Sequence, residues 1–284
     1  MKPQSWTIGE VKITAVLEID LIASSRIFFP TATLEELMAI EWLRPTYMTD
    51  KGRLIMWVQA FVVETPTKRI VVDTCVGNDK TRVGMGDKLN TDFLQRFEAA
   101  GFPCESIDTV LCTHLHVDHV GWNTRLVDGR WVPTFPKARY LMEASEIEYW
   151  STNFRDEDDA AIFADSVRPV IDAGLVDPVA SDHVICPEVR LVSTPGHTPG
   201  HVSVMIESQG EQGFITGDMI HSPAQIAHPE WGAYVDYDSD ASTVTRHKVL
   251  AELADGPVRV FGTHFPAPTV GRIVRDGTTY RFED

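Results

Sequence analysis

Short apolar segments recur along the whole chain, either alternating with polar residues or standing between turn residues, and they predict β-strands. The first two such segments lie on either side of a Gly9-Glu10 turn near the N-terminus. The predicted strands cover residues 6–17, 54–64, 69–73, 109–113, 138–142, 189–193, 201–207, 213–216, 258–261, 271–275 and 278–282.

Segments with helical spacing separate these strands. Thr33 and Glu36 form a T-x-x-E capping box ahead of apolar residues, which marks the start of a helix. The predicted helices cover residues 33–43, 91–100, 144–150, 156–174 and 239–254. Because strands and helices mix throughout, with no linker rich in Pro, Gly or Ser, we predict a single α/β domain over residues 1–284 with two β-rich halves.

Composition restricts the possible partners. The 284 residues include 25 Lys and Arg but 41 Asp and Glu, which gives a net charge of −16. Such a surface repels phosphate backbones and anionic lipid, so we expect a small-molecule substrate and neither a nucleic acid nor a membrane as partner. The first 20 residues lack the apolar core of a signal peptide, and no run of 18 apolar residues exists. We therefore predict a cytoplasmic protein.

The strongest chemical signal is an H-x-H-x-D-H segment directly after the predicted strand 109–113. Residues i and i+2 at the end of an extended strand point the same way, so His114 and His116 can bind one metal ion together. Asp118 and His119 follow where the chain must turn, and they can reach a second position nearby. Imidazole and carboxylate together are expected ligands for zinc, manganese or iron.

Three later segments offer further donors, each at the end of an apolar strand. They are His197 in a loop restrained by glycines and prolines, Asp218 after Gly217, and His264 after Gly262-Thr263. Strand ends lie at a sheet edge, so we expect all of these side chains to meet there.

From about Trp57 to His264, these motifs and their order resemble those of the metallo-β-lactamase superfamily. The resemblance implies an αββα sandwich of two mixed sheets flanked by helices, with two divalent metal ions at one edge. Zinc is our first choice, with Mn, Co or Fe as alternatives. His114, His116 and His197 would hold one ion, Asp118, His119 and His264 the other, and Asp218 would bridge both together with a hydroxide.

The same resemblance implies a mechanism and two supporting residues. The bridging hydroxide would attack the substrate while Asp118 orients it. Asp73 would accept a hydrogen bond from a ligand histidine, although it could equally be a turn residue at a strand end. His201 would support the site without binding metal. Cys75 stands where the family usually has glycine, so the loop after Asp73 is expected to differ.

Among hydrolases of this family, the chain is most similar to the quorum-quenching lactonase and methyl parathion hydrolase-like group. We therefore predict a hydrolase that opens a lactone or cleaves an ester-type small substrate. The apolar segment 21–57 would form a lid or a homodimer contact, or else ordinary core. Phe28 and Trp57 from this segment, and Trp122 after the metal motif, are candidate pocket residues.

One departure concerns His221, three residues after the predicted bridging aspartate. Homoserine lactone lactonases have a substrate-contacting tyrosine there, and a histidine could protonate a leaving alkoxide instead. His221 could also be a packing residue. The alternatives are a mononuclear-iron persulfide dioxygenase, an organophosphate or β-lactam hydrolase using the same site, and a non-catalytic binding protein.

Overall fold

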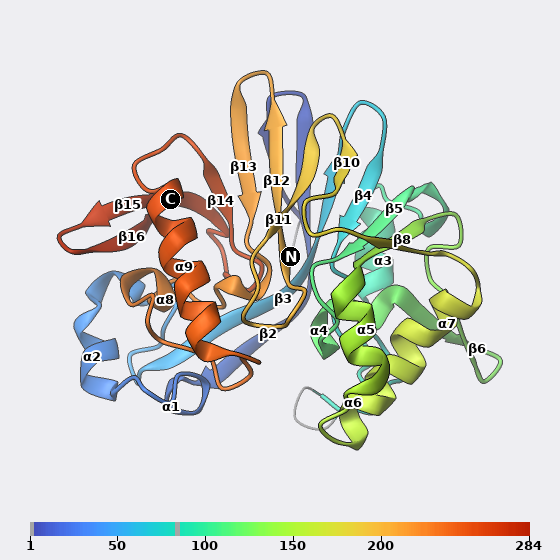
Figure 1. Ribbon diagram of the computed structural model, residues 1–284, viewed down its shortest axis with the longest axis horizontal. Helices are drawn as coiled ribbons and strands as arrows, with labels where there is room; N and C mark the ends of the chain where they lie inside the picture. The colour runs from blue at the N-terminus through green and yellow to red at the C-terminus, as the bar shows by residue number, and fades with distance from the viewer. Residues whose placement is uncertain (1–2, 83–85) are drawn as a thin grey trace.

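Two seven-stranded sheets form the centre of the computed structural model, which describes residues 3–82 and 86–284 (Figure 1). The first sheet contains, in spatial order, β1 (Gln4–Ile8), β2 (Val11–Ser24), β3 (Arg53–Glu64), β4 (Arg69–Val72), β5 (Thr109–Cys112), β8 (Arg139–Glu143) and β9 (Val176–Val179). The second contains β10 (Val184–Cys186), β11 (Val189–Ser193), β12 (Val202–Ser208), β13 (Glu211–Ile215), β14 (Arg259–Phe261), β15 (Val270–Asp276) and β16 (Thr279–Glu283).

Both sheets are mixed. The first begins as an antiparallel β1–β4 meander and continues with β4, β5, β8 and β9 in parallel. The second is antiparallel except for the β13–β14 pair. Parallel neighbours need crossover connections, and the helices supply them.

Helices cover the outer face of each sheet (Figure 1). On the side of the first sheet lie α3 (Phe93–Ala99), α4 (Val117–Val120), α5 (Ala144–Thr152), α6 (Glu157–Ile162) and α7 (Arg168–Asp172). The other side carries α1 (Ser25–Phe28), α2 (Leu34–Ala39), α8 (Ala224–Ala227) and α9 (Ser239–Leu253). Single turns lie at Glu41–Leu43, Cys104–Ser106, Gly121–Asn123 and Gly217–Met219, and a π-helical turn at Phe163–Val167.

Side-chain alternation along the strands creates the layers. On β3, Phe61 and Val63 face the core between the two sheets, whereas Ala60 and Val62 face the core beneath the helices of the first sheet. Successive side chains of a strand point to opposite faces, so a strand covered on both sides is apolar throughout. The predicted αββα sandwich is confirmed.

Most of the predicted elements are present with shifted ends. The predicted helix 33–43 ends at Ala39 and continues as the Glu41–Leu43 turn, and the Thr33–Glu36 capping box is formed. The predicted helix 156–174 is divided by the π-helical turn. All four cysteines are buried and free, as expected for reduced thiols.

Four strands were not predicted: β6 (Thr124–Val127), β7 (Arg130–Pro133), β9 and β10. The first two form a separate hairpin around Asp128-Gly129, both with positive φ, and an Asp-Gly pair is a recognised hairpin signal. β9 contains Pro178, which argues against a strand unless it lies at a sheet edge, as it does here.

The apolar segment 21–57 is largely core. It connects the long strands β2 and β3, and most of its bulky side chains pack beneath the second sheet. The buried large side chains are Phe29, Leu37, Ile40, Leu43, Tyr47, Met48, Leu54, Met56 and Trp57. Ile22 and Ile27 remain exposed. Across residues 3–82 and 86–284, no helix combines the length and apolar character needed to cross a bilayer.

Candidate metal centre

Strand ends from both sheets converge on one edge of the sandwich. The first sheet contributes Asp73 after β4 and the segment 114–119 after β5. The second contributes His197 from the β11–β12 loop, Asp218 after β13 and His264 after β14. The seven predicted metal ligands, which are spread over 151 positions of sequence from His114 to His264, therefore meet at one place.

The donors fall into overlapping groups whose ligand atoms all lie within 4.8 Å of one another. His114, His116 and His197 form the first group, and Asp118, His119 and His264 form a second. Asp218 joins His114 and His119 in a third and pairs with His197 and His221 in a fourth. The structure therefore brings the seven predicted ligands together, with Asp218 next to members of both predicted sets.

In the first group, three ring nitrogens point at one another. His116 Nδ1 lies 2.8 Å from His197 Nε2 and 3.1 Å from His114 Nε2. Burial lowers the pKa of all three rings, that of His116 to about 4, so they are neutral near pH 7. Neutral imidazoles with converging lone pairs are the form that binds a divalent metal.

Asp218 is the common neighbour of both groups. Its Oδ2 lies 3.2 Å from His119 Nε2 and 3.5 Å from His197 Nε2, while its Oδ1 lies 3.0 Å from His264 Nε2. Asp118 is 3.6 Å from both His119 and His264. A carboxylate whose Oδ2 lies close to histidines of both groups is suited to bridging two cations.

Several buried polar atoms of this cluster have no hydrogen-bond partner among residues 3–82 and 86–284. They are His119 Nε2, Asp218 Oδ1, and both ring nitrogens of His221. Buried polar atoms are nearly always paired, so a cluster of unpaired nitrogen and oxygen atoms in one place calls for a ligand. Histidine and carboxylate donors of this kind fit divalent cations such as zinc.

Neighbouring groups orient the histidines from behind. Asp73 Oδ2 lies 2.9 Å from His119 Nδ1, and the same carboxylate accepts from the hydroxyl of Thr113, which lies 3.0 Å from His114 Nδ1. Asp73 thus lies where the sequence predicted, beside a histidine of the cluster. Asp73 and Cys75 both have positive φ, so the loop does contain a strained position where the family has glycine.

His201 supports the cluster without facing it. Its Nε2 accepts from the amide of Asp218 at 2.8 Å, and its Nδ1 lies 3.1 Å from the carbonyl of Thr194. Gly217 has φ +54, and a Cβ there would lie 2.6 Å from the His201 ring nitrogen. The Gly217-Asp218 pair therefore requires glycine for both its conformation and its contact.

Sequence reasoning missed three positioning contacts. The carbonyl of Trp57 accepts from His264 Nδ1 at 2.8 Å, and Gln59 Nε2 donates to carbonyls around His264. Asp236 lies 2.9 Å from His197 Nδ1. Backbone carbonyls carry no sequence signature, and neither Gln59 nor Asp236 belongs to a motif.

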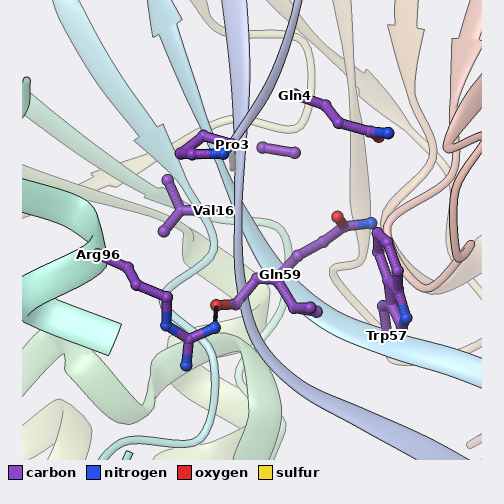
Figure 2. A pocket seen from close by; sticks show the side chains of 8 residues that line it. Pro3, Gln4, Val16, Trp57, Gln59 and Arg96 are labelled. Atoms are coloured by element: carbon purple, nitrogen blue, oxygen red, sulfur yellow. Dashed lines mark hydrogen bonds between the residues drawn. The ribbon is translucent and has the colours of Figure 1, made fainter. Parts of the chain in front are cut away.

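Figure 2 shows Trp57 and Gln59 on β3 beside a small cavity that is also lined by Pro3, Gln4, Val16 and Arg96. Its volume is about 20 Å³, room for about one water molecule. None of the metal donors lines this cavity. Trp57 therefore contacts His264 through its backbone carbonyl, and it also lines this small cavity, which no metal donor reaches.

Phe28 and Trp122, the other two candidate pocket residues, lie in different parts of the structure. The Phe28 ring lies 5.0 Å from that of His221, which itself is 3.2 Å from Asp218 Oδ2. Trp122 stacks on Phe93 in the core and donates its indole N–H to Glu18, a contact of 2.6 Å. These contacts place Phe28 beside the cluster and Trp122 in the core away from it.

A family model described as the metallo-beta-lactamase superfamily matches residues 58–264. This chain belongs to that superfamily. Among curated relatives, an N-acyl homoserine lactonase of a Bacillus species is 24% identical over 231 residues, which cover 76% of this chain and 84% of the relative.

Solved structures share the fold over nearly the whole chain. AidC, a dizinc quorum-quenching lactonase, superposes with a TM-score of 0.82 at 23% identity, covering 99% of this chain and 96% of AidC. The hydrolase AbOPH of the beta lactamase superfamily superposes with a TM-score of 0.81 at 25% identity, covering 99% and 97%. The predicted class of metal-dependent hydrolase is confirmed, and the relatives do not favour the persulfide dioxygenase alternative.

Proposed function

We propose that this chain is a dinuclear-metal hydrolase that opens a lactone or cleaves a related ester. The observation that carries the proposal is the convergence of the seven predicted donors, together with His221, into four overlapping groups of three whose ligand atoms lie within 4.8 Å of one another. His114, His116 and His197 would hold the first ion, and Asp118, His119 and His264 the second. Asp218 would contact both.

Two bound divalent ions would lower the pKa of a shared water and polarise the substrate carbonyl. Zinc is our first choice, because the donors are imidazole and carboxylate and AidC is a dizinc enzyme. Manganese, cobalt and iron stay open, because geometry and availability select among such metals more than affinity does.

Asp118 is the carboxylate best placed to meet water and substrate. Its side chain is 14% exposed, against 5% for Asp218. It can orient the attacking water through one oxygen and accept its proton. Asp218 is enclosed by histidines, so we assign it to holding the two positions together.

His221 is the proposed acid for the leaving group. Lactone opening releases an alkoxide, which needs a proton as the ring opens. His221 is 2% exposed, and neither of its ring nitrogens has a hydrogen-bond partner in the part of the chain that the structure describes. Its backbone is fixed by a 2.8 Å bond from its amide to Gln225 Oε1. A rigid imidazole beside the central carboxylate can donate to an oxygen that approaches the cluster.

The relatives support a lactone as substrate. The curated relative is named for hydrolysis of N-acyl homoserine lactones, and AidC is a quorum-quenching lactonase. Phe28 forms an apolar wall beside His221 and contacts Tyr234 at 5.7 Å between rings. Such a wall suits a substrate with an apolar acyl group next to the ester carbonyl.

The proposal is tested with metal-quantified protein on a panel of lactones, aryl esters, organophosphates and β-lactams. We expect two ions per chain, turnover of lactones, loss of activity on chelation, and recovery with zinc, manganese or cobalt. A single iron per chain, with oxygen consumed on glutathione persulfide and no lactone turned over, would instead establish the dioxygenase.

A further inference from the structure

We propose that Asp236 is a positioning residue that orients His197 and sets the affinity of the first metal position, with Arg246 holding Asp236 in place. This inference rests on the proposed dinuclear centre. Asp236 lies in the loop between α8 and α9 and belongs to none of the metal motifs.

The Asp236 carboxylate leaves His197 a single useful orientation. Asp236 Oδ1 lies 2.9 Å from His197 Nδ1, and both side chains are fully buried. His197 Nε2 faces the cluster, 2.8 Å from His116 Nδ1. The proton of a neutral His197 therefore belongs on Nδ1, where it is donated to Asp236, and the Nε2 lone pair is directed at the metal position.

The second carboxylate oxygen of Asp236 is fixed as well. It accepts from the amide of Ala233 at 3.0 Å and lies 3.6 Å from Arg246 Nη1. The guanidinium of Arg246 is also fully buried. A carboxylate that is held at both oxygens cannot rotate away from His197 when substrate or metal enters.

Arg246 connects this contact to the rest of the cluster. Its Nε donates to the carbonyl of Pro229 at 2.7 Å and its Nη1 to the hydroxyl of Ser242 at 2.6 Å. A longer contact of 3.5 Å reaches the carbonyl of Met219, the residue after Asp218. One buried arginine on α9 therefore connects Asp236, the partner of His197, to the turn that carries Asp218.

Backbone contacts separate the role of the Asp236 side chain from that of its loop. The amide of Tyr237 donates to the carbonyl of His197, and that of Asp238 to the carbonyl of Gly196, each at 2.9 Å. These bonds do not involve the Asp236 side chain. Replacing that side chain should therefore leave the two loops together while releasing the His197 ring.

The test uses Asp236→Asn, with Asp238→Asn as matched control. Asn keeps the shape of Asp236 but has a single accepting oxygen and no charge, so it cannot accept from both His197 and the amide of Ala233, and its hold on His197 is weakened. Asp238 caps α9 by accepting from the amide of Ala241, a role that Asn also fills. We expect Asp236→Asn to weaken one of two zinc ions by roughly 10- to 100-fold in chelator competition. The control should keep both ions, and Asp236→Glu should recover part of the loss.

Unpaired Arg246 could itself unfold the Asp236→Asn variant, so the double variant Asp236→Asn/Arg246→Gln is measured beside it. If either folded variant binds both ions as tightly as the wild type, the inference is wrong. Equal weakening of both ions also overturns it, because that indicates a general structural role. A wild-type chain with fewer than two ions overturns the dinuclear centre itself.

Discussion

Asp218 is ionised and its neighbour His264 is protonated when no metal is bound. Burial by itself would raise the pKa of this carboxyl, but His119, His264 and His221 hold it well below its usual range. Burial likewise opposes the charged form of His264, yet Asp218 and Asp118 raise its pKa to about 9. A proton on His264 would have to leave before this ring could bind a cation. We therefore expect metal binding to release protons into solution.

The role proposed for His221 can be tested by substitution. We expect His221→Phe to lower kcat on lactones by about 100-fold, because a positioned general acid typically contributes at least that much. Steady-state kinetics and metal analysis check this together. His221→Tyr should retain activity, since a phenol can also donate.

Two results would contradict that role. An unchanged kcat in His221→Phe would show that His221 is not the general acid. Loss of an ion from the same variant would make His221 a ligand, which its place in a donor group with His197 and Asp218 permits geometrically.

The residues that could be predicted are those whose types and spacing restrict the chemistry. H-x-H-x-D-H and the strand-end His197, Asp218 and His264 identify the cluster because few other patterns place such donors together. The carbonyl of Trp57 was beyond prediction, because every residue has a carbonyl. Asp236 was too, because only the tertiary fold brings it to His197, 39 positions away.

At the scale of elements, α5 joins two of the ligand loops through Glu146. This buried carboxylate accepts from the amide of Leu115 at 3.2 Å, between two ligand histidines, and from the amide of Gly200 at 2.8 Å, in the loop of His197. It also accepts from the indole of Trp150. Through the side chain of Glu146, α5 therefore contacts one loop from each sheet.

We expect Glu146→Gln to lower the free energy of unfolding by about 1–3 kcal/mol, because an amide N–H would then face one of three buried donors. Urea denaturation measures the change. Glu148→Gln on the exposed face of the same helix is the matched control and should behave as the wild type. Equal midpoints for the two variants would show that Glu146 does not hold the loops.

Element prediction succeeded where burial imposes a period and failed where an element is short. The two-sided apolar strand β3 was found almost to the residue, because twelve positions share one pattern. The hairpin β6–β7 has four residues per strand and no regular alternation of burial, so its Asp128-Gly129 turn is the clearest signal in the sequence. The π-helical turn at Phe163–Val167 interrupts a sequence that reads as continuous helix.

At the scale of the whole molecule, the net charge of −16 does not describe the charge of the donor cluster. Only Asp118 and Asp218 among the acids are proposed ligands. Two divalent ions would leave the cluster locally positive within an acidic surface. We expect that arrangement to repel polyanions and still to admit a neutral lactone.

A buried lysine makes the stability of the fold depend on pH. Burial lowers the pKa of Lys80 to about 7 despite Asp165 nearby. An unfolded lysine titrates near pH 10.4, so between about pH 7 and 10 the unfolded chain binds more protons and stability rises with pH. We expect the free energy of unfolding of the wild type, relative to Lys80→Met, to increase by on the order of 1 kcal/mol per pH unit over this range.

Urea denaturation at pH 7, 8 and 9 gives that difference directly. Lys137→Met, at an exposed position, is the control and should run parallel to the wild type. A constant gap between wild type and Lys80→Met would mean that Lys80 stays charged in the fold.

The homodimer stays a prediction, and only a few exposed apolar side chains of segment 21–57 are left to support it. Segment 21–57 keeps Ile22 and Ile27 exposed, at 55% and 67%, and Leu34 at 42%, while its other large apolar side chains are buried or half-buried. If Ile22 and Ile27 lie in a dimer contact, Ile22→Asp/Ile27→Asp should halve the mass measured by light scattering and leave the metal content unchanged. A wild-type monomer at micromolar concentration would contradict the dimer.

The proposed ligands come from both sheets, and this division has a consequence for the life of the protein. Ions bound at that edge would act as a clasp across the sandwich, since neither layer could separate without giving up donors. A ligand that binds only the folded state at about 1,000 times its Kd adds about 4 kcal/mol to stability. In a cell short of metal, newly made copies would be both idle and easier for proteases to open, so metal supply would govern abundance as well as activity.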